Sequence, residues 1–151
     1  NNPFEHPPVR DCPEATPELA PPAPGAVADT LAACGGRYAL ACELWRDFQP
    51  ISEPNGDPLA AVVTLTECDS LVVPDGLLFD HLWVVDGTEF WSTGFNDPDP
   101  EVVAPYRIRA VATCGPKWDT GSLVDVVVAV RCAGAAPQYV RLRDVPIRRT
   151  D

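Results

Sequence analysis

Short apolar runs separated by turn residues recur along most of the chain, and several alternate between apolar and polar positions. The segment 106–114 shows this clearly, with Ile108 and Ala110 on one side and Arg107 and Arg109 on the other. A period of two is typical of a β-strand that buries one face, because successive side chains point to opposite faces of a sheet. The pattern therefore predicts strands.

Seven segments are predicted to be strands, with turn residues between them. They span residues 37–48, 60–68, 82–85, 88–91, 106–114, 123–132 and 139–147. The first also fits a helix with Leu40, Leu44 and Phe48 in one stripe, but the strand is preferred because every later segment is strand-like. As a strand it has one apolar face, on which Arg46 is the exception.

Asp86-Gly87 is predicted to be the two-residue loop of a hairpin, since Asp-Gly favours the positive φ angles of that turn. The resulting register places Trp83 opposite Phe90, with Trp83 in the core and Trp91 on the other face.

Residues 106–132 are predicted to form another hairpin. In it Cys114 and Cys132 would lie roughly 33 Å apart at the usual rise per residue. A disulfide needs Cα atoms within about 7 Å, so these two cysteines should not be bonded to each other. The turn at residues 54–58 instead brings Cys42 close to Cys68, which makes that pair plausible.

Seven short strands with turns between them predict an all-β fold, a two-sheet antiparallel sandwich. The order Cys68, Trp83, Cys114 resembles immunoglobulin-like domains over about residues 60–132. In those domains a tryptophan packs on an inter-sheet disulfide. Ala112 stands where they have a tyrosine, and a jelly roll fits the strand pattern nearly as well.

The N-terminal part differs in composition, because eight of the 18 prolines lie within the first 24 residues. Proline lacks an amide donor and favours extended polyproline II geometry. We expect an extended proline-rich arm over residues 1–30 and one disulfide-stapled domain over residues 31–151. The arm is either a disordered tail or a segment that docks on a neighbouring subunit.

The cysteine content indicates export, because an even number without a metal-binding spacing suits a disulfide framework. The six candidates, all expected to be oxidised, are Cys12, Cys34, Cys42, Cys68, Cys114 and Cys132. Cys12 would pin the arm to Cys34 or to a cysteine of another chain. We expect a secreted or cell-surface protein without direct membrane insertion, since no apolar run approaches the ~20 residues that a membrane helix needs.

Charge is divided unevenly within a net of −11. Residues 1–105 carry 18 acidic and three basic residues, and residues 106–151 carry four acidic and eight basic residues. An acidic surface repels nucleic acid, so no nucleic-acid partner is expected. The complementary acidic and basic parts suit contacts between copies of the chain.

One loop could bind calcium, because it places several side-chain oxygens between prolines. The candidate ligands are Asn96, Asp97, Asp99 and Glu101. No other cofactor is expected. No catalytic constellation is recognisable, since His81 is the one plausible base within the domain and no serine lies in a Gly-x-Ser-x-Gly elbow.

We therefore expect a non-enzymatic structural subunit of an extracellular or surface assembly, such as a filament, whose partners are copies of itself or other surface proteins. The arm would dock on a neighbour by adding a strand to its sheet. The expected contact residues are Phe4, Val9, Trp91, Trp118, Arg141 and Arg143. The alternative is a monomeric binding module for a glycan or a protein, using exposed tryptophans and the acidic loop.

Overall fold

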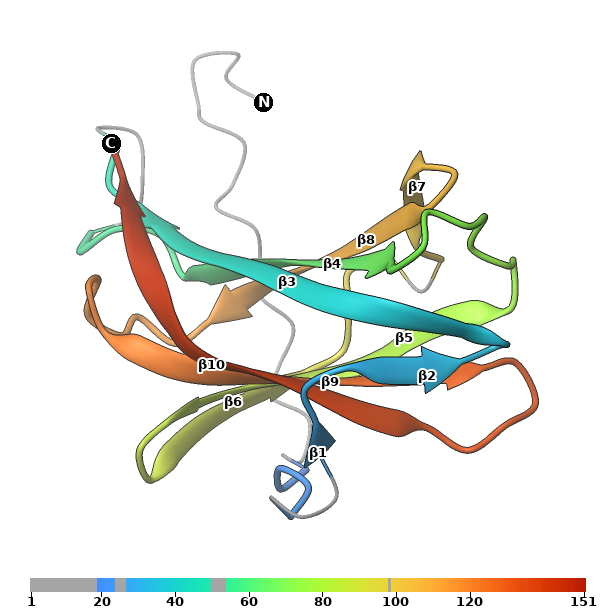
Figure 1. Cartoon of the computed structure of the whole chain (residues 1–151). Coiled ribbons are helices and arrows are strands. Elements are labelled where there is room, and N and C mark those ends of the chain that lie inside the picture. The colour runs from blue at the N-terminus through green and yellow to red at the C-terminus, as the bar shows by residue number, and fades with distance from the viewer. Residues whose placement is uncertain (1–18, 24–26, 50–53, 98) are drawn as a thin grey trace, which may run out of the picture.

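The computed structural model describes residues 19–23, 27–49, 54–97 and 99–151, and every regular element in these ranges is a β-strand (Figure 1). The strands are β1 (Val27–Ala28), β2 (Leu31–Ala33), β3 (Gly36–Asp47), β4 (Leu59–Glu67), β5 (Leu77–Asp86), β6 (Glu89–Thr93), β7 (Glu101–Ala104), β8 (Arg107–Gly115), β9 (Leu123–Cys132) and β10 (Gln138–Thr150). The all-β prediction is confirmed, and β3 is the strand that was preferred over a helix. No helix in these ranges is long and apolar enough to span a membrane.

The strands form one sheet in the order β6-β5-β9-β10-β3-β4-β8-β7, with β1 beside β10 and β2 beside β3. Most neighbours are antiparallel, but β10 runs parallel to β1 and to β3. The sheet is therefore mixed, and the expectation of a purely antiparallel arrangement is wrong. Alternation of apolar residues reports which face of a strand is buried and carries no information on the direction of its neighbour.

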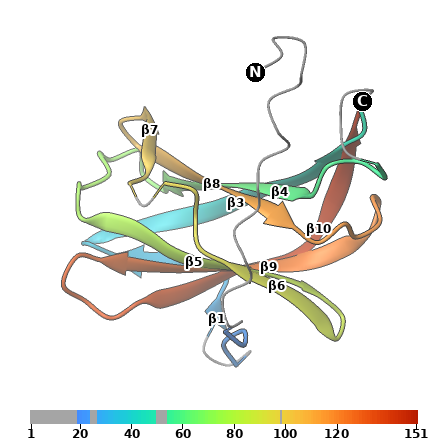
Figure 2. The same ribbon diagram turned by 180° about the vertical axis from the view of Figure 1, so that it is seen from behind.

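Strand β10 causes the sheet to curl. It pairs with β9 as far as Pro146 and with β3 from Ile147. Its register shifts between Leu142 and Val145, where Asp144 has a φ of 56°. A bulge of this kind bends a strand, and Figures 1 and 2 show β3, β4 and β8 lying over β5 and β9.

The inner faces of the two halves share one core. Its fully buried side chains come from strands of both halves, among them Leu44, Val63, Val84 and Val126. The core face predicted for residues 106–114 is confirmed, because Ile108, Ala110 and Ala112 of β8 are buried. The even-numbered valines of β9 are buried in the same core.

The predicted hairpin over residues 106–132 is wrong. Strand β8 pairs with β4 and β7, whereas β9 pairs with β5 and β10. The two strands lie in opposite halves of the curled sheet, so their apolar faces meet across the core (Figure 1). Two apolar strands joined by a short connection look the same in sequence whether they pair edge to edge or pack face to face.

The hairpin of β5 and β6 is confirmed, but its loop lies one residue later than predicted. Asp86 pairs with Glu89, so the loop is Gly87-Thr88. Only its first residue, Gly87, has a positive φ, at 61°, as a type II′ turn requires. Trp83 consequently lies opposite Ser92 and not Phe90.

A disulfide joins Cys34, between β2 and β3, to Cys132 at the end of β9, with Cα atoms 5.4 Å apart. Cys114 is also disulfide-bonded, and Cys12 lies outside the described residues. The prediction that Cys114 and Cys132 are not bonded to each other is therefore confirmed, and Cys34 is not the partner of Cys12.

Cys42 and Cys68 are free thiols, so the predicted pair between them and the expectation of full oxidation are both wrong. Cys42 pairs in register with Val63, whereas Cys68 follows Glu67, the partner of Tyr38. Cys68 therefore lies five residues beyond the position opposite Cys42, an offset of about 17 Å at strand rise, well beyond disulfide reach.

Candidate functional site

The outward-facing side of β5, β9 and β10 carries a cluster of apolar and aromatic side chains separate from the main core. We call this surface the outer face. Trp83, Val127 and Ala129 are its buried centre, and Val27, Val85, Phe90 and Tyr139 pack around them. The ring centroids of Trp83 and Tyr139 lie 5.9 Å apart, and those of His81 and Trp83 lie 4.6 Å apart.

A bulge in β5 turns Trp83 outward. Phe79 pairs with Val130 and His81 pairs with Ala129, so Asp80 is an extra residue that has no backbone pairing position opposite it on β9. Strict alternation from Phe79 would direct His81 and Trp83 into the core. The bulge reverses the faces beyond it, and Leu82 and Val84 become the fully buried core residues instead.

The outer face is buried because the chain itself covers part of it. The indole Nε1–H of Trp83 donates a hydrogen bond of 3.0 Å to the carbonyl oxygen of Leu19. Pro21 and Pro22 are half-buried. Figures 1 and 2 both show residues 19–23 on the far side of β9 and β10 from β3, β4 and β8.

Strand β1 continues this attachment. Val27 pairs with Tyr139 as a short parallel addition to the edge of β10. The described part of the predicted arm thus docks on its own domain, by one side-chain hydrogen bond, half-buried prolines and a two-residue strand. Phe4 and Val9, the arm residues expected to contact a partner, lie outside the described residues.

Arg141 lies beside the outer face. Val127 pairs with Trp83 on one side and with Arg141 on the other, so the three form one row across the sheet. The Nε atom of Arg141 is buried and has no hydrogen-bond partner within the described ranges. A buried unpaired donor is costly, so this position favours an acceptor. Arg143, the other expected contact on β10, is exposed at the bulge.

His81 and Ser92 also lie on this side of the sheet, with Nε2 and Oγ 2.6 Å apart. Burial lowers the pKa of His81, and the charge of Asp80 opposes this shift. A nucleophile needs a base that a third group orients. Asp80, the carboxylate whose charge acts on His81, instead forms an ion pair with Arg131 at 2.8 Å. The His81–Ser92 contact is therefore a cross-strand hydrogen bond between β5 and β6.

The two tryptophans expected at a contact surface lie elsewhere. Trp91 is 7% exposed and belongs to the main core, so its placement on a contact face is wrong. The bulge in β5 accounts for this, because it exchanges the roles of Trp83 and Trp91. Trp118 is half-buried against the edge of the core, and its carbonyl oxygen accepts a hydrogen bond of 2.9 Å from Arg46.

The structure does not bring the four candidate calcium ligands together. Asn96 Oδ1 accepts a hydrogen bond from Thr113, and Asp97 Oδ1 accepts one from the backbone N–H of Asp99. Glu101 forms a bidentate ion pair with Arg109 across β7 and β8. Arg109 donates from Nε to Oε2 at 2.9 Å and from Nη2 to Oε1 at 3.0 Å. Among the described residues no group of three or more acidic, histidine or cysteine side chains is arranged to hold a metal ion.

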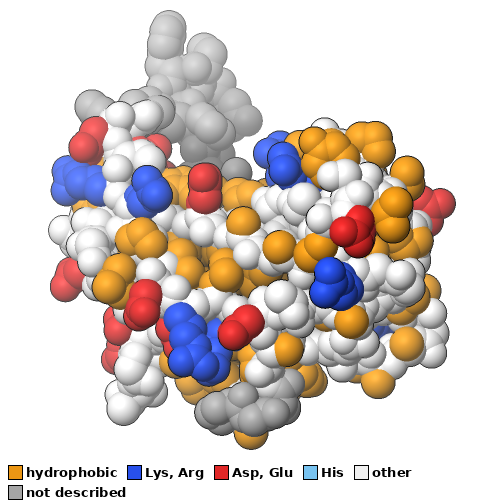
Figure 3. Space-filling view, viewed as in Figure 1, with side chains coloured by type: hydrophobic (Ala, Val, Ile, Leu, Met, Phe, Trp, Pro, Cys, Tyr) orange, Lys and Arg blue, Asp and Glu red, His pale blue; other side chains and the backbone are white. Residues whose placement is uncertain are grey.

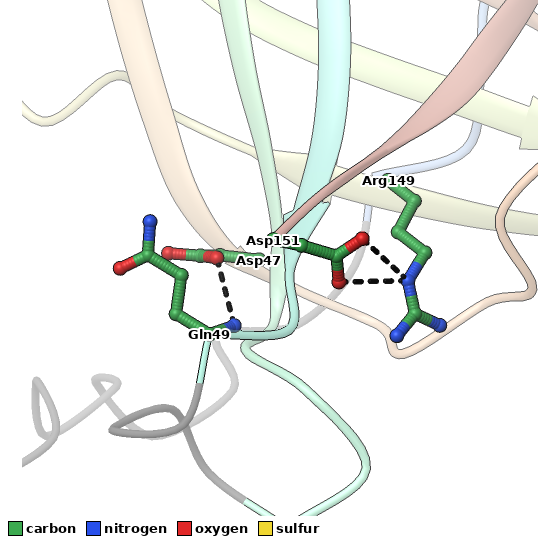
Figure 4. Close-up of polar contacts among 4 residues, drawn as sticks. All are labelled: Asp47, Gln49, Arg149 and Asp151. Atoms are coloured by element: carbon green, nitrogen blue, oxygen red, sulfur yellow. Dashed lines mark hydrogen bonds and ion pairs between the residues drawn. The ribbon is translucent and has the colours of Figure 1, made fainter.

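An open hollow of about 750 Å³ lies where β3 and β10 end. Its lining comprises Arg46, Phe48, Asn55, Lys117, Asp119, Thr120 and Arg149. The cations here are engaged by the protein itself. Arg149 pairs with Asp151 at 2.9 Å (Figure 4), and Lys117 donates to the carbonyl oxygen of Pro54. Asp47, at the end of β3, accepts a hydrogen bond from the backbone of Gln49 (Figure 4). The hollow thus consists of loops closed by their own ion pairs and hydrogen bonds.

A second apolar surface is exposed at β7, an edge strand of the sheet. Figure 3 shows apolar side chains gathered over this end of the molecule. The exposed residues nearby are Val102 and Val103 of β7 and Leu71 and Val72 of the loop between β4 and β5. The backbone N–H of Val73 in that loop donates a hydrogen bond to the carbonyl oxygen of Pro105, just after β7. An exposed apolar edge strand favours contact with another protein.

The sequence analysis did not predict the outer face, although the sequence of β9 indicates a strand that is covered on both faces. Residues 126–130 are apolar without interruption, which is typical of a strand covered on both faces. No protein-family model, curated protein or solved structure matches this chain in the comparisons made.

Proposed function

We propose that this chain is a non-enzymatic subunit of an extracellular or cell-surface assembly, in which the N-terminal arm of one copy docks on a neighbour. The observation that carries the proposal is the hydrogen bond from Trp83 to Leu19, because it marks a docking surface for the arm on the domain. A segment that docks in this way on its own domain can make the same contacts on a second copy, which is domain swapping.

Charge supports the same proposal. The first 23 residues contain four acidic side chains and one arginine, whereas β10, beside the docking surface, carries Arg141 and Arg143. Opposite charges on the arm and the acceptor strand favour encounter between copies. The exposed apolar edge at β7 offers a further contact.

The compartment is also a proposal. The Cys34–Cys132 disulfide is consistent with an oxidising environment outside the cytosol. We propose further that the curled sheet is a two-layer sandwich, since its halves face each other across one core and β10 passes between them at a bulge. The immunoglobulin-like subtype has less support, because Cys68 is a free thiol and Trp83 faces outward.

The alternative function, a monomeric module that binds a glycan or a protein, has less support than assembly. It relied on Trp91 and Trp118 as exposed aromatics and on the loop of residues 96–101 as an acidic site, and Trp118 is half-buried against the core. Trp91 lies in the core, and Glu101 of that loop is paired with Arg109.

Sedimentation velocity of the full chain tests the assembly proposal. We expect a mass of two or more copies that rises with concentration. Replacing Pro21 and Pro22 together by serine should reduce it towards one copy, while the matched replacement of the exposed Pro137 should leave it unchanged. A cysteine-to-serine change at Cys12 separates covalent from non-covalent association. A single-copy mass at every concentration would rule the proposal out.

A further inference from the structure

We infer that the outer face of β5, β9 and β10 is a recognition site for extended proline-rich peptide segments, with the indole N–H of Trp83 as its central donor. The inference rests on the proposed function and deepens it, since it names the surface and the class of segment that would join one copy to the next.

Proline-rich segments present a particular recognition problem. Each proline lacks an N–H, so such a segment offers carbonyl acceptors and flat apolar rings but few donors. A surface that recognises it must therefore supply side-chain donors set among apolar and aromatic groups. Tryptophan meets both needs, because its ring is apolar and its indole nitrogen only donates.

The outer face has this composition. Trp83 is 5% exposed, and its indole N–H is satisfied by the carbonyl oxygen of Leu19, the second residue before Pro21. Val127 and Ala129 form the apolar floor, and Tyr139 stands at one side. Pro21 and Pro22 are half-buried in the same segment. The contact thus joins an indole donor set among apolar side chains to a carbonyl acceptor, and two half-buried prolines follow that acceptor in the chain.

Arg141 provides a second hydrogen-bond donor in the row of residues that crosses the sheet from Trp83. Arg141 is joined to Trp83 through Val127 by strand pairing. Its buried Nε atom has no partner among the described residues, so it is available to a further carbonyl oxygen or to a carboxylate. The sequence before Leu19 contains both kinds of acceptor, since Pro13, Glu14, Pro17 and Glu18 alternate there. An acidic proline-rich segment therefore matches the positive charge of Arg141.

The chain's own N-terminal segment occupies the site, and this explains how the site would serve assembly. Residues 19–23 occupy it within one chain, and a neighbouring copy carries the same segment. A tethered segment competes at a high effective concentration, so a free peptide should bind the unaltered chain weakly. Weakening the resident segment should expose the site to an added peptide that keeps both prolines, whereas the arms of other altered copies are weakened in the same way.

The test uses full-length chains and a fluorescently labelled peptide with the sequence of residues 14–23, followed by fluorescence anisotropy. The chain with Pro21→Ser and Pro22→Ser should bind the peptide at least about tenfold more tightly than the unaltered chain, because the competing segment is weakened. Adding Trp83→Phe should weaken that binding by about two- to tenfold, as expected for one lost hydrogen bond. Adding Trp118→Phe instead is the matched control and should have no effect.

A second readout covers the case in which Trp83→Phe disturbs the fold. In nitrogen–proton correlation spectra, the Trp83 indole signal should shift in the Pro21→Ser, Pro22→Ser chain and return on addition of the peptide. An unmoved indole signal, absent binding, or equal binding by the Trp83→Phe and Trp118→Phe chains would each overturn the inference. Peptide binding by a chain that sediments as a single copy would retain this site and reject the proposed assembly. Assembly of the chain without peptide binding would support the proposed assembly and reject this site.

Discussion

The guanidinium of Arg46 donates a hydrogen bond of 2.9 Å from Nη1 to the carbonyl oxygen of Trp118, 72 residues further along the chain. Arg46 also donates from Nε to the carbonyl oxygen of Asp57 at 3.0 Å and from Nη2 to that of Asn55. The side chain is 4% exposed. One arginine at the end of β3 thus joins two loops that approach from different strands.

Replacing Arg46 by methionine should lower the free energy of unfolding by about 3 kcal/mol or more, because three backbone carbonyl groups lose their charged donor. Chemical denaturation measures this. Arg148→Met is the matched control, since Arg148 is exposed on β10 and should change stability by less than about 0.5 kcal/mol. Equal stability of the two variants would show that the three hydrogen bonds contribute nothing net.

Replacing both Cys34 and Cys132 by alanine should lower the free energy of unfolding by about 2–5 kcal/mol. The bond closes a sequence separation of 98 residues, so its loss frees a large part of the unfolded chain. The measurement is the midpoint of urea unfolding for the altered and unaltered chains. Coincident midpoints would contradict the expected contribution.

Cys42 and Cys68 should differ in reactivity. Burial raises the pKa of the Cys42 thiol to about 12, with a smaller contribution from the charge of Glu43, whereas Cys68 is exposed. At pH 8 a thiol with that pKa is about one part in ten thousand thiolate. Iodoacetamide should therefore label Cys68 in the native chain and Cys42 only after denaturation, as peptide mass mapping would reveal. Rapid native labelling of Cys42 would contradict the packing of β3.

Glu67 should make stability depend on pH in the acid range. Backbone hydrogen bonds, led by that of Leu71, lower the pKa of this carboxyl below its ordinary value of 4.5, against the opposing effect of burial. A carboxyl with a lowered folded pKa stabilises the fold above pH 4.5, and this contribution is lost as the pH falls through the folded pKa.

The melting temperature of the unaltered chain should therefore fall more steeply between about pH 5 and pH 3 than that of Glu67→Gln. Glu101→Gln is a useful comparison, since Glu101 is an exposed partner of Arg109. Parallel pH profiles for the unaltered chain and Glu67→Gln would show that the stability of the fold does not depend on the negative charge of Glu67.

Strand periodicity predicted seven of the ten strands that the structure describes, because a period of two survives in any strand that faces one core. It missed the short strands β1, β2 and β7. It identified β3 despite a competing helical stripe, and it marked Arg46 as the polar exception on an apolar face. It could not reveal why an arginine is tolerated there, since its acceptors are backbone carbonyl groups contributed by distant loops.

The register between strands and the side of each strand that is buried were harder to predict. One extra residue, Asp80, reverses the two sides of β5, and with them the roles of Trp83 and Trp91. The register between β3 and β4 depends on a loop longer than the turn signal at residues 54–58 suggested, which separates Cys42 from Cys68. Both errors arise because a shift of one or a few positions in pairing changes every neighbour without changing the local pattern.

Strand β10 also governs the order in which the molecule can form. Strands β3 and β9 both pair with it, yet they precede it in the chain and are synthesised first. Until β10 emerges, each leaves a row of backbone groups open along one side, and most contacts that would close the fold join distant parts of the chain. Such non-local closure is slow and leaves open edges that invite association of incomplete chains. Closure of the curled sheet therefore has to wait until β10, which follows β3 and β9 in the chain, has been made.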